Sequence, residues 1–103
     1  MSDKLPKLQA MLEKQPNDPF LLYAIAMEFK NANEPAKAVA SLEKCLAADP
    51  NYCYAYFQRG QIYEITGDLE SARRSYNAGI DAAKRTGDAH AESELQGALE
   101  MLA

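Results

Sequence analysis

Apolar residues recur at helical spacing along most of the chain, and short polar segments with proline, glycine or asparagine interrupt them. The first segment places its apolar residues on one helical face, and Pro16 ends it. These residues are Leu5, Leu8, Met11 and Leu12. The same pattern predicts about six helices, which cover residues 3–15, 19–31, 35–48, 52–66, 69–85 and 89–102. We therefore expect an all-α fold.

The residues at the breaks suit helix ends. Asp18 can cap the second helix, and Pro19 can occupy its first position, where a missing N–H costs nothing. Gly67 can take the left-handed conformation that ends a helix, and Asp68 can cap the next one. By the same reasoning, Asn51 is predicted to cap the fourth helix.

The chain also nearly repeats itself after 34 residues, because Pro16-Asn17 recurs as Pro50-Asn51. Large positions match large ones at this offset, and small positions match small ones. The pairs are Leu22 with Tyr56, Ala26 with Gly60, Phe29 with Tyr63, Leu42 with Tyr76, Leu46 with Ile80 and Ala38 with Ala72. Such alternation of large and small residues lets two helices nest. The period and pattern resemble the tetratricopeptide repeat, a unit of two antiparallel helices.

This resemblance implies an α-solenoid of antiparallel helix pairs in one domain, residues 1–103. Its parts would be an N-terminal half repeat (1–17), two full repeats (18–52 and 53–86) and a capping helix (87–103). The family's packing positions are met by Leu22, Ile25, Ala26, Phe29, Ala38, Leu42, Cys45 and Pro50, and then by Tyr56, Gly60, Tyr63, Ala72, Tyr76 and Gly79. Two positions depart from the family pattern. Lys84 replaces the closing proline, and Arg59 replaces a large apolar residue.

Arg59 has two interpretations. Its guanidinium either reaches Glu28 or Asp88 at an opened seam, or its stem packs while its head lies in water. Either arrangement predicts atypical packing of the last repeat.

The family binds peptides or partner helices on the concave surface formed by the first helix of each repeat. The matching positions here are Phe20, Tyr23, Met27, Lys30, Tyr54, Phe57, Gln58, Gln61 and Glu64. Aromatic side chains are good anchors for an apolar or helical ligand. In the alternative interpretation, Tyr54 and Phe57 pack on the preceding repeat, or the chain's own terminus fills the groove. The resemblance thus implies a non-catalytic adaptor that binds a peptide or helix of another protein.

One subset of the family holds the acidic C-termini of heat-shock chaperones with Lys, Asn and Arg side chains. The corresponding positions here carry Tyr23, Met27, Tyr54 and Gln58. An acidic tail would meet apolar rings and negative charge, so this ligand class is disfavoured.

Self-association is the alternative function. The unpaired half repeat at the N-terminus presents Leu5, Leu8 and Leu12, which a second copy can cover to make a homodimer.

The charge distribution excludes other partners. The net charge is -4, and residues 86–103 contain four acidic residues and no lysine or arginine. Without a basic stripe, nucleic-acid binding is not expected. No segment approaches the ~20 apolar residues of a membrane span, so we expect no membrane partner and a cytoplasmic protein.

Catalytic chemistry has little support in the sequence. His90 is the only histidine, and its i, i+4 spacing from Glu94 is typical of a surface pair. Cys45 and Cys53 lack a CxxC pattern and are interpreted as reduced thiols, with a disulfide between them as the alternative. No phosphate loop, nucleophile motif or metal-ligand set is present in the sequence. We therefore expect no enzyme activity, no cofactor and no metal.

Overall fold

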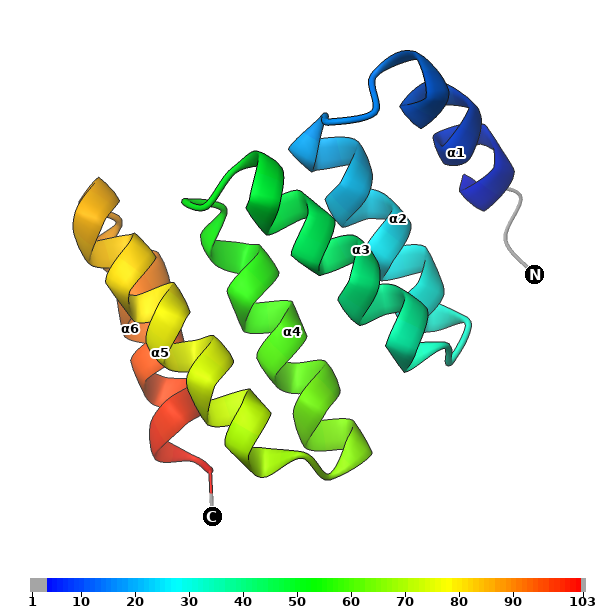
Figure 1. Cartoon of the computed structure of the whole chain (residues 1–103). Helices are drawn as coiled ribbons and strands as arrows, with labels where there is room; N and C mark the ends of the chain where they lie inside the picture. The colour runs from blue at the N-terminus through cyan, green and yellow to red at the C-terminus, as the bar shows by residue number, and fades with distance from the viewer. Residues whose placement is uncertain (1–3, 103) are drawn as a thin grey trace. The chain divides into compact units, whose positions relative to one another are not determined.

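The structure, a computed structural model, describes residues 4–102, and within that range it consists of six helices and no strand (Figure 1). The helices are α1 (Lys4–Lys14), α2 (Pro19–Asn31), α3 (Pro35–Ala48), α4 (Cys53–Thr66), α5 (Leu69–Thr86) and α6 (Ala89–Glu100). The predicted all-α fold and its six helices are confirmed. None of these helices is both long and apolar enough to cross a lipid bilayer.

The helices form two compact units that divide between Asp49 and Pro50. In the first unit, α2 packs against α3, and α1 packs against α2. In the second unit, α4 pairs with α5, and α6 packs mainly on α5 with a smaller contact to α4. Short turns join the paired helices, which run antiparallel (Figure 1).

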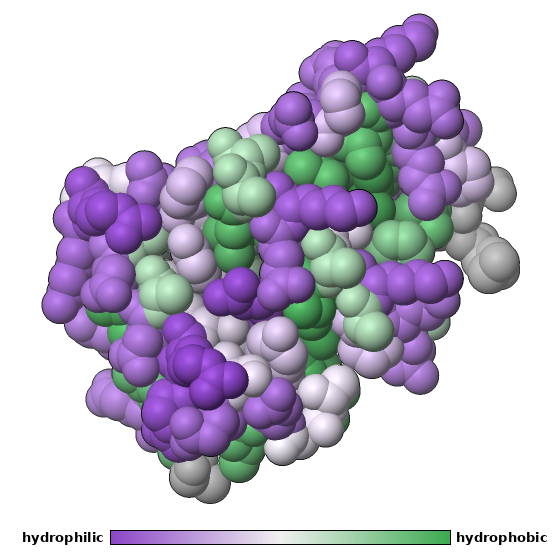
Figure 2. Space-filling view, viewed as in Figure 1, coloured by the Kyte–Doolittle hydropathy of each residue, from purple (hydrophilic) through white to green (hydrophobic). Residues whose placement is uncertain are grey.

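The core residues of the first unit come from α2 and α3. They are Leu21, Leu22, Ile25, Ala26, Ala38, Leu42, Cys45 and Leu46. By contrast, none of the 11 residues of α1 is buried, and Met11 is 51% exposed. Figure 2 shows hydrophobic residues at the surface where α1 lies along α2. Leu5, Leu8 and Leu12 are half-buried, so the apolar face of the N-terminal helix is only partly covered.

Tyr76 lies at the centre of the second unit's core and is fully buried. It forms one core cluster with Cys53, Ala72, Ile80, Ala82, Ala83, Ala91 and Leu95. Gly60 gives the ring room, because a Cβ there would lie 2.3 Å from Tyr76 Cε1. A Cβ at Gly79 would lie 2.8 Å from the Cβ of Tyr56. The second unit thus contains the predicted nesting of large residues against small ones.

Polar caps start three of the helices. Asp18 Oδ1 accepts hydrogen bonds from the N–H groups of Phe20 and Leu21, at 2.9 and 3.3 Å. At the start of α6, Asp88 accepts from the N–H of Ala91 at 3.0 Å. These carboxylates satisfy N–H groups that have no partner within the helix.

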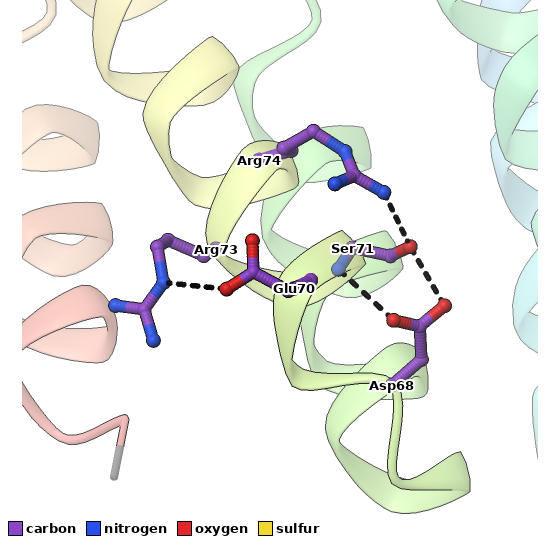
Figure 3. Close-up of polar contacts among 5 residues, drawn as sticks. All are labelled: Asp68, Glu70, Ser71, Arg73 and Arg74. Atoms are coloured by element: carbon purple, nitrogen blue, oxygen red, sulfur yellow. Dashed lines mark hydrogen bonds and ion pairs between the residues drawn. The ribbon is translucent and has the colours of Figure 1, made fainter.

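Asp68 caps α5 most fully (Figure 3). Its carboxylate accepts from the backbone N–H of Ser71 at 3.1 Å and from the Ser71 hydroxyl at 2.7 Å. Arg74 donates to the same hydroxyl, and Arg73 pairs with Glu70 beside it. Hydrogen bonds from the Ser71 side chain and then from its backbone hold the pKa of Asp68 below its ordinary value of 3.8. The predicted cap at Asp68 is confirmed.

The predicted cap at Asn51 is wrong. Tyr52 precedes α4 without a side-chain cap, and Asn51 Oδ1 instead accepts hydrogen bonds from Arg85 Nε and Nη2 at 3.2 and 3.0 Å. Arg85 also donates to the carbonyl of Pro50. A basic side chain at the end of α5 therefore takes the oxygen that could have capped α4.

Arg59 takes a partner that the sequence analysis did not consider. Its Nε donates to the hydroxyl of buried Ser75 at 2.9 Å, and its guanidinium lies over the ring of Tyr56. The suggested pairing with Asp88 is not among the ion pairs of residues 4–102, and the Asp88 carboxylate caps α6. Arg59 thus joins α4 to α5, where it replaces the apolar contact of the family pattern.

Candidate functional site

Three of the predicted groove residues lie on one face of α4 and line a hollow in the second unit. Phe57, Gln61 and Glu64 have the i, i+4, i+7 spacing that aligns side chains along a helix. The hollow measures about 310 Å³. Its other lining residues are Tyr76 of α5, Glu94, Gly97 and Ala98 of α6, and Met101 directly after α6.

The sequence predicted a capping role for α6 and, as an alternative, a terminus that fills the groove, but it did not predict that residues of α6 line a hollow together with α4. Glu94, Gly97, Ala98 and Met101 follow the i, i+3, i+4, i+7 spacing of one helical face. This row of residues, which runs beside the apolar packing face, was the feature of the sequence that could have indicated a contribution of α6 to the hollow. The packing face itself is confirmed, because Leu95 is buried and Ala98, Leu99 and Leu102 pack against the core of the unit.

Phe57 contributes both to the hollow and to the core. Its ring packs against the core cluster, with its centroid 6.1 Å from that of Tyr76 and the planes tilted by 53°. The Tyr76 hydroxyl donates a hydrogen bond to the carboxylate of Glu64. Burial and, after it, the contact with Glu64 raise the pKa of Tyr76 well above its ordinary value. The Tyr76 phenol therefore stays neutral and holds Glu64 at the edge of the hollow.

Exposed apolar side chains lie at two edges of the site. Met101, which is 85% exposed, belongs to the hollow itself. Ile65, which is 72% exposed, lines a second depression of about 290 Å³ that shares Gln61 and Glu64 with it. The hollow and the depression thus form one continuous surface along α4, which we call the α4–α6 site.

The remaining predicted groove residues do not line this hollow. On α4, Tyr54 is 42% exposed and Gln58 is half-buried. The residues on α2 belong to the first unit. There Phe20 is 64% exposed, while Tyr23, Met27 and Lys30 are half-buried.

The reactive side chains form no second site in the described part of the chain. Residues 4–102 contain no group of three histidine, cysteine or acidic side chains arranged to hold a metal. His90 contacts Glu94 at the surface, as expected for the i, i+4 pair. Cys45 and Cys53 are buried, which is the main reason why the pKa of each thiol is raised, to about 11 for Cys45.

Comparison with known proteins identifies the class to which this helical arrangement belongs. Models of the tetratricopeptide repeat match residues 21–52 and 41–74. The chain is 34% identical to a tetratricopeptide repeat domain protein of Salinibacter ruber, whose crystal structure aligns with a TM-score of 0.73. That alignment covers 80% of this chain and 91% of the other. The chain therefore belongs to the tetratricopeptide repeat family, as its sequence predicted.

Two further relatives extend the likeness over more of the chain. A TPR repeat-containing protein of Pseudomonas aeruginosa is 28% identical over 88 residues, which is 85% of this chain and 84% of that protein. The solution structure of a Bordetella parapertussis protein is 27% identical and covers 99% of this chain and 89% of its own, with a TM-score of 0.84. Repeats of this family generally mediate protein–protein interaction.

Proposed function

We propose that this chain is a non-catalytic adaptor and that the α4–α6 site binds a segment of another protein. The observation that carries the proposal is the open hollow lined by Phe57, Gln61 and Glu64, three residues at the family's binding positions. The general role of the family in protein–protein interaction supports the same conclusion.

The composition of the hollow suits a side chain of a partner better than a reaction. Its surface combines an aromatic ring, the small residues Gly97 and Ala98, and the exposed thioether of Met101. Aromatic and flexible methionine side chains are typical of surfaces that anchor peptides or helices. The remaining residues at family binding positions are proposed as further contacts of the partner. They are Phe20, Tyr23, Met27, Lys30, Tyr54 and Gln58.

Position 97 offers a sharp test of this proposal. Gly97 lines the hollow and a Cβ added there meets nothing within 4 Å, so we expect a large side chain at this position to obstruct the hollow. Peptides selected from a display library on the wild-type protein should lose binding to the Gly97→Trp variant. They should still bind Gly97→Ala, because that variant leaves the hollow open.

The helical content and the unfolding midpoint of both variants would be measured to show that they remain folded. Selected peptides that bind all three proteins equally would contradict the α4–α6 site as the binding surface. A selection that enriches no peptide would contradict the adaptor function itself.

Self-association is the second candidate function, and the exposure of α1 favours it. None of the residues of α1 is buried, and its apolar side chains include Leu5, Leu8 and Met11. A second copy that covers this face would form a symmetric dimer. Sedimentation equilibrium should then give twice the monomer mass for the wild type and the monomer mass for Leu8→Glu. A wild type that stays monomeric at tens of micromolar contradicts this candidate.

A further inference from the structure

We infer that the α4–α6 site accepts a cationic amphipathic segment, with an apolar side chain against Phe57 and lysine or arginine side chains beside Glu64 and Glu94. This inference rests on the proposed function and specifies the chemistry of the partner. It also includes α6 in the binding surface, to which the family resemblance assigned only a capping role.

The floor of the hollow is apolar and open. Phe57 and Ala98 both line it, and a Cβ added at the lining residue Gly97 would meet nothing within 4 Å. The exposed side chains of Ile65 and Met101 extend the apolar surface at its edges. An amphipathic segment can therefore bury one large apolar residue in the hollow and contact these edges on either side.

Two carboxylates, those of Glu64 and Glu94, lie at the hollow. Glu64 accepts a hydrogen bond from the neutral phenol of Tyr76, and Glu94 contacts the ring of His90. Among residues 4–102, neither carboxylate forms an ion pair with a lysine or an arginine. Two carboxylates that have no lysine or arginine partner and lie beside an apolar surface attract a cationic side chain and repel an acidic one.

The basic residues of the second unit do not offset this charge at the hollow, because none of them lines it. The four arginines have partners elsewhere in the unit: Ser75 for Arg59, Glu70 for Arg73, Ser71 for Arg74 and Asn51 for Arg85. Figure 3 shows Arg73 and Arg74 held in this way at the start of α5. The remaining cation, Lys84, is exposed near the other end of the same helix. The site therefore has a local excess of negative charge.

A matched pair of peptides tests the inference. One carries leucines on one helical face and lysines on the other, and in its counterpart glutamates replace the lysines. We expect the lysine peptide to bind the full chain measurably in fluorescence anisotropy and the glutamate peptide not to bind. The Glu64→Gln/Glu94→Gln variant should bind the lysine peptide roughly fivefold more weakly and with a smaller dependence on salt.

The substitutions at Glu64 and Glu94 remove the negative charge of each side chain and change its size little. Glutamine at position 64 retains an oxygen that can accept from the Tyr76 hydroxyl, so the local packing is kept. The control is Glu70→Gln/Asp81→Asn, which removes the same charge from exposed positions on α5 outside the hollow. It should bind the lysine peptide as the wild type does. Equal weakening by both double variants would show a non-specific effect of net charge and overturn the inference.

The blocking variant separates failure of this inference from failure of the proposed function. Two peptides that bind equally, and that Gly97→Trp excludes equally, would leave the α4–α6 site as a binding surface but refute its preference for cations. A lysine peptide that does not bind the wild type would also refute the preference, whereas the adaptor function would still be judged by the display selection. Binding that survives Gly97→Trp would place the peptide elsewhere and overturn both.

Discussion

Gly60 and Gly97 are both helical glycines, but they have opposite surroundings. A Cβ at position 60 would lie 2.3 Å from the ring of the fully buried Tyr76, while a Cβ at position 97 meets nothing within 4 Å. Alanine favours a helix over glycine by about 0.8 kcal/mol, so propensity alone predicts that both alanine variants are more stable. Packing reverses the sign of the expected stability change at position 60, whereas position 97 keeps the sign that helix propensity predicts.

We therefore expect Gly60→Ala to lower the free energy of unfolding by about 2 kcal/mol, because the extra methyl group overpacks the α4–α5 contact. Gly97→Ala should raise it by about 0.8 kcal/mol through helix propensity. Urea denaturation followed by circular dichroism measures both. A stabilised Gly60→Ala variant would mean that the two helices separate more easily than the contact with Tyr76 implies.

Asp68 gives the stability a predictable dependence on pH. Hydrogen bonds from Ser71 hold its pKa in the folded state below the ordinary value of 3.8. A lowered pKa contributes stability that is fully present above the ordinary value and is lost as the pH falls through the folded-state pKa. The Asp68→Asn variant keeps a capping oxygen but cannot ionise. Its unfolding free energy should therefore decline less than that of the wild type below pH 3.8.

Urea denaturation at a series of acidic pH values measures this difference. Asp81→Asn is the control, because Asp81 is an exposed carboxylate within α5 rather than at its start. It should follow the wild-type decline. If the unfolding free energies of Asp68→Asn and the wild type declined in parallel with pH, the ionisation of Asp68 would contribute nothing to the stability.

Among the helices, α6 depends most clearly on a single apolar side chain. Leu95 is 1% exposed and belongs to the core of the second unit, whereas Gln96 beside it is exposed. Leu95→Ala should lower the free energy of unfolding by about 3 kcal/mol, since truncation of a buried leucine removes apolar contacts and leaves a cavity. Gln96→Ala should change it by less than about 0.5 kcal/mol. Similar small losses for both variants in urea denaturation would show that α6 is not part of the cooperative core.

The helices themselves were predictable because their signals are local. Apolar spacing, the acidic caps and the left-handed Gly67 all lie within or next to the helix they define. Asn51 and Arg59 were not predictable in the same way, because their partners Arg85 and Ser75 lie 34 and 16 residues away. Their hydrogen bonds depend on which turn of α5 faces α4, and periodicity alone does not fix that register.

The proposed binding face was predicted only in part, because only part of its signal is local. Phe57, Gln61 and Glu64 could be assigned from the repeat register, and in the structure they line one hollow. The opposite wall on α6 lies beyond the second repeat, where the 34-residue match no longer applies. Only the packing of α6 against the core brings Glu94 and Met101 to the hollow. The whole candidate site could therefore be identified only from the tertiary structure, although the row of residues that each helix contributes can be found in the sequence.

At the scale of the whole molecule, the two compact units each contain one buried cysteine, which makes the opening of each unit separately measurable. Cys45 belongs to the first unit and Cys53 to the core of the second. Burial raises the pKa of both thiols, so neither reacts readily while its surroundings stay closed. Labelling by a thiol reagent therefore reports local opening.

We expect Leu95→Ala to accelerate labelling of Cys53 about tenfold or more, because the lost core packing lowers the free energy of opening in that unit. In repeat proteins stability is approximately a sum of local and nearest-neighbour terms, so Cys45 should be accelerated less. Pulsed labelling followed by mass spectrometry of the digested protein resolves the two thiols, and Gln96→Ala serves as the control. Equal acceleration of both cysteines would instead mean that the chain opens as a single cooperative unit, despite the division of its contacts between Asp49 and Pro50.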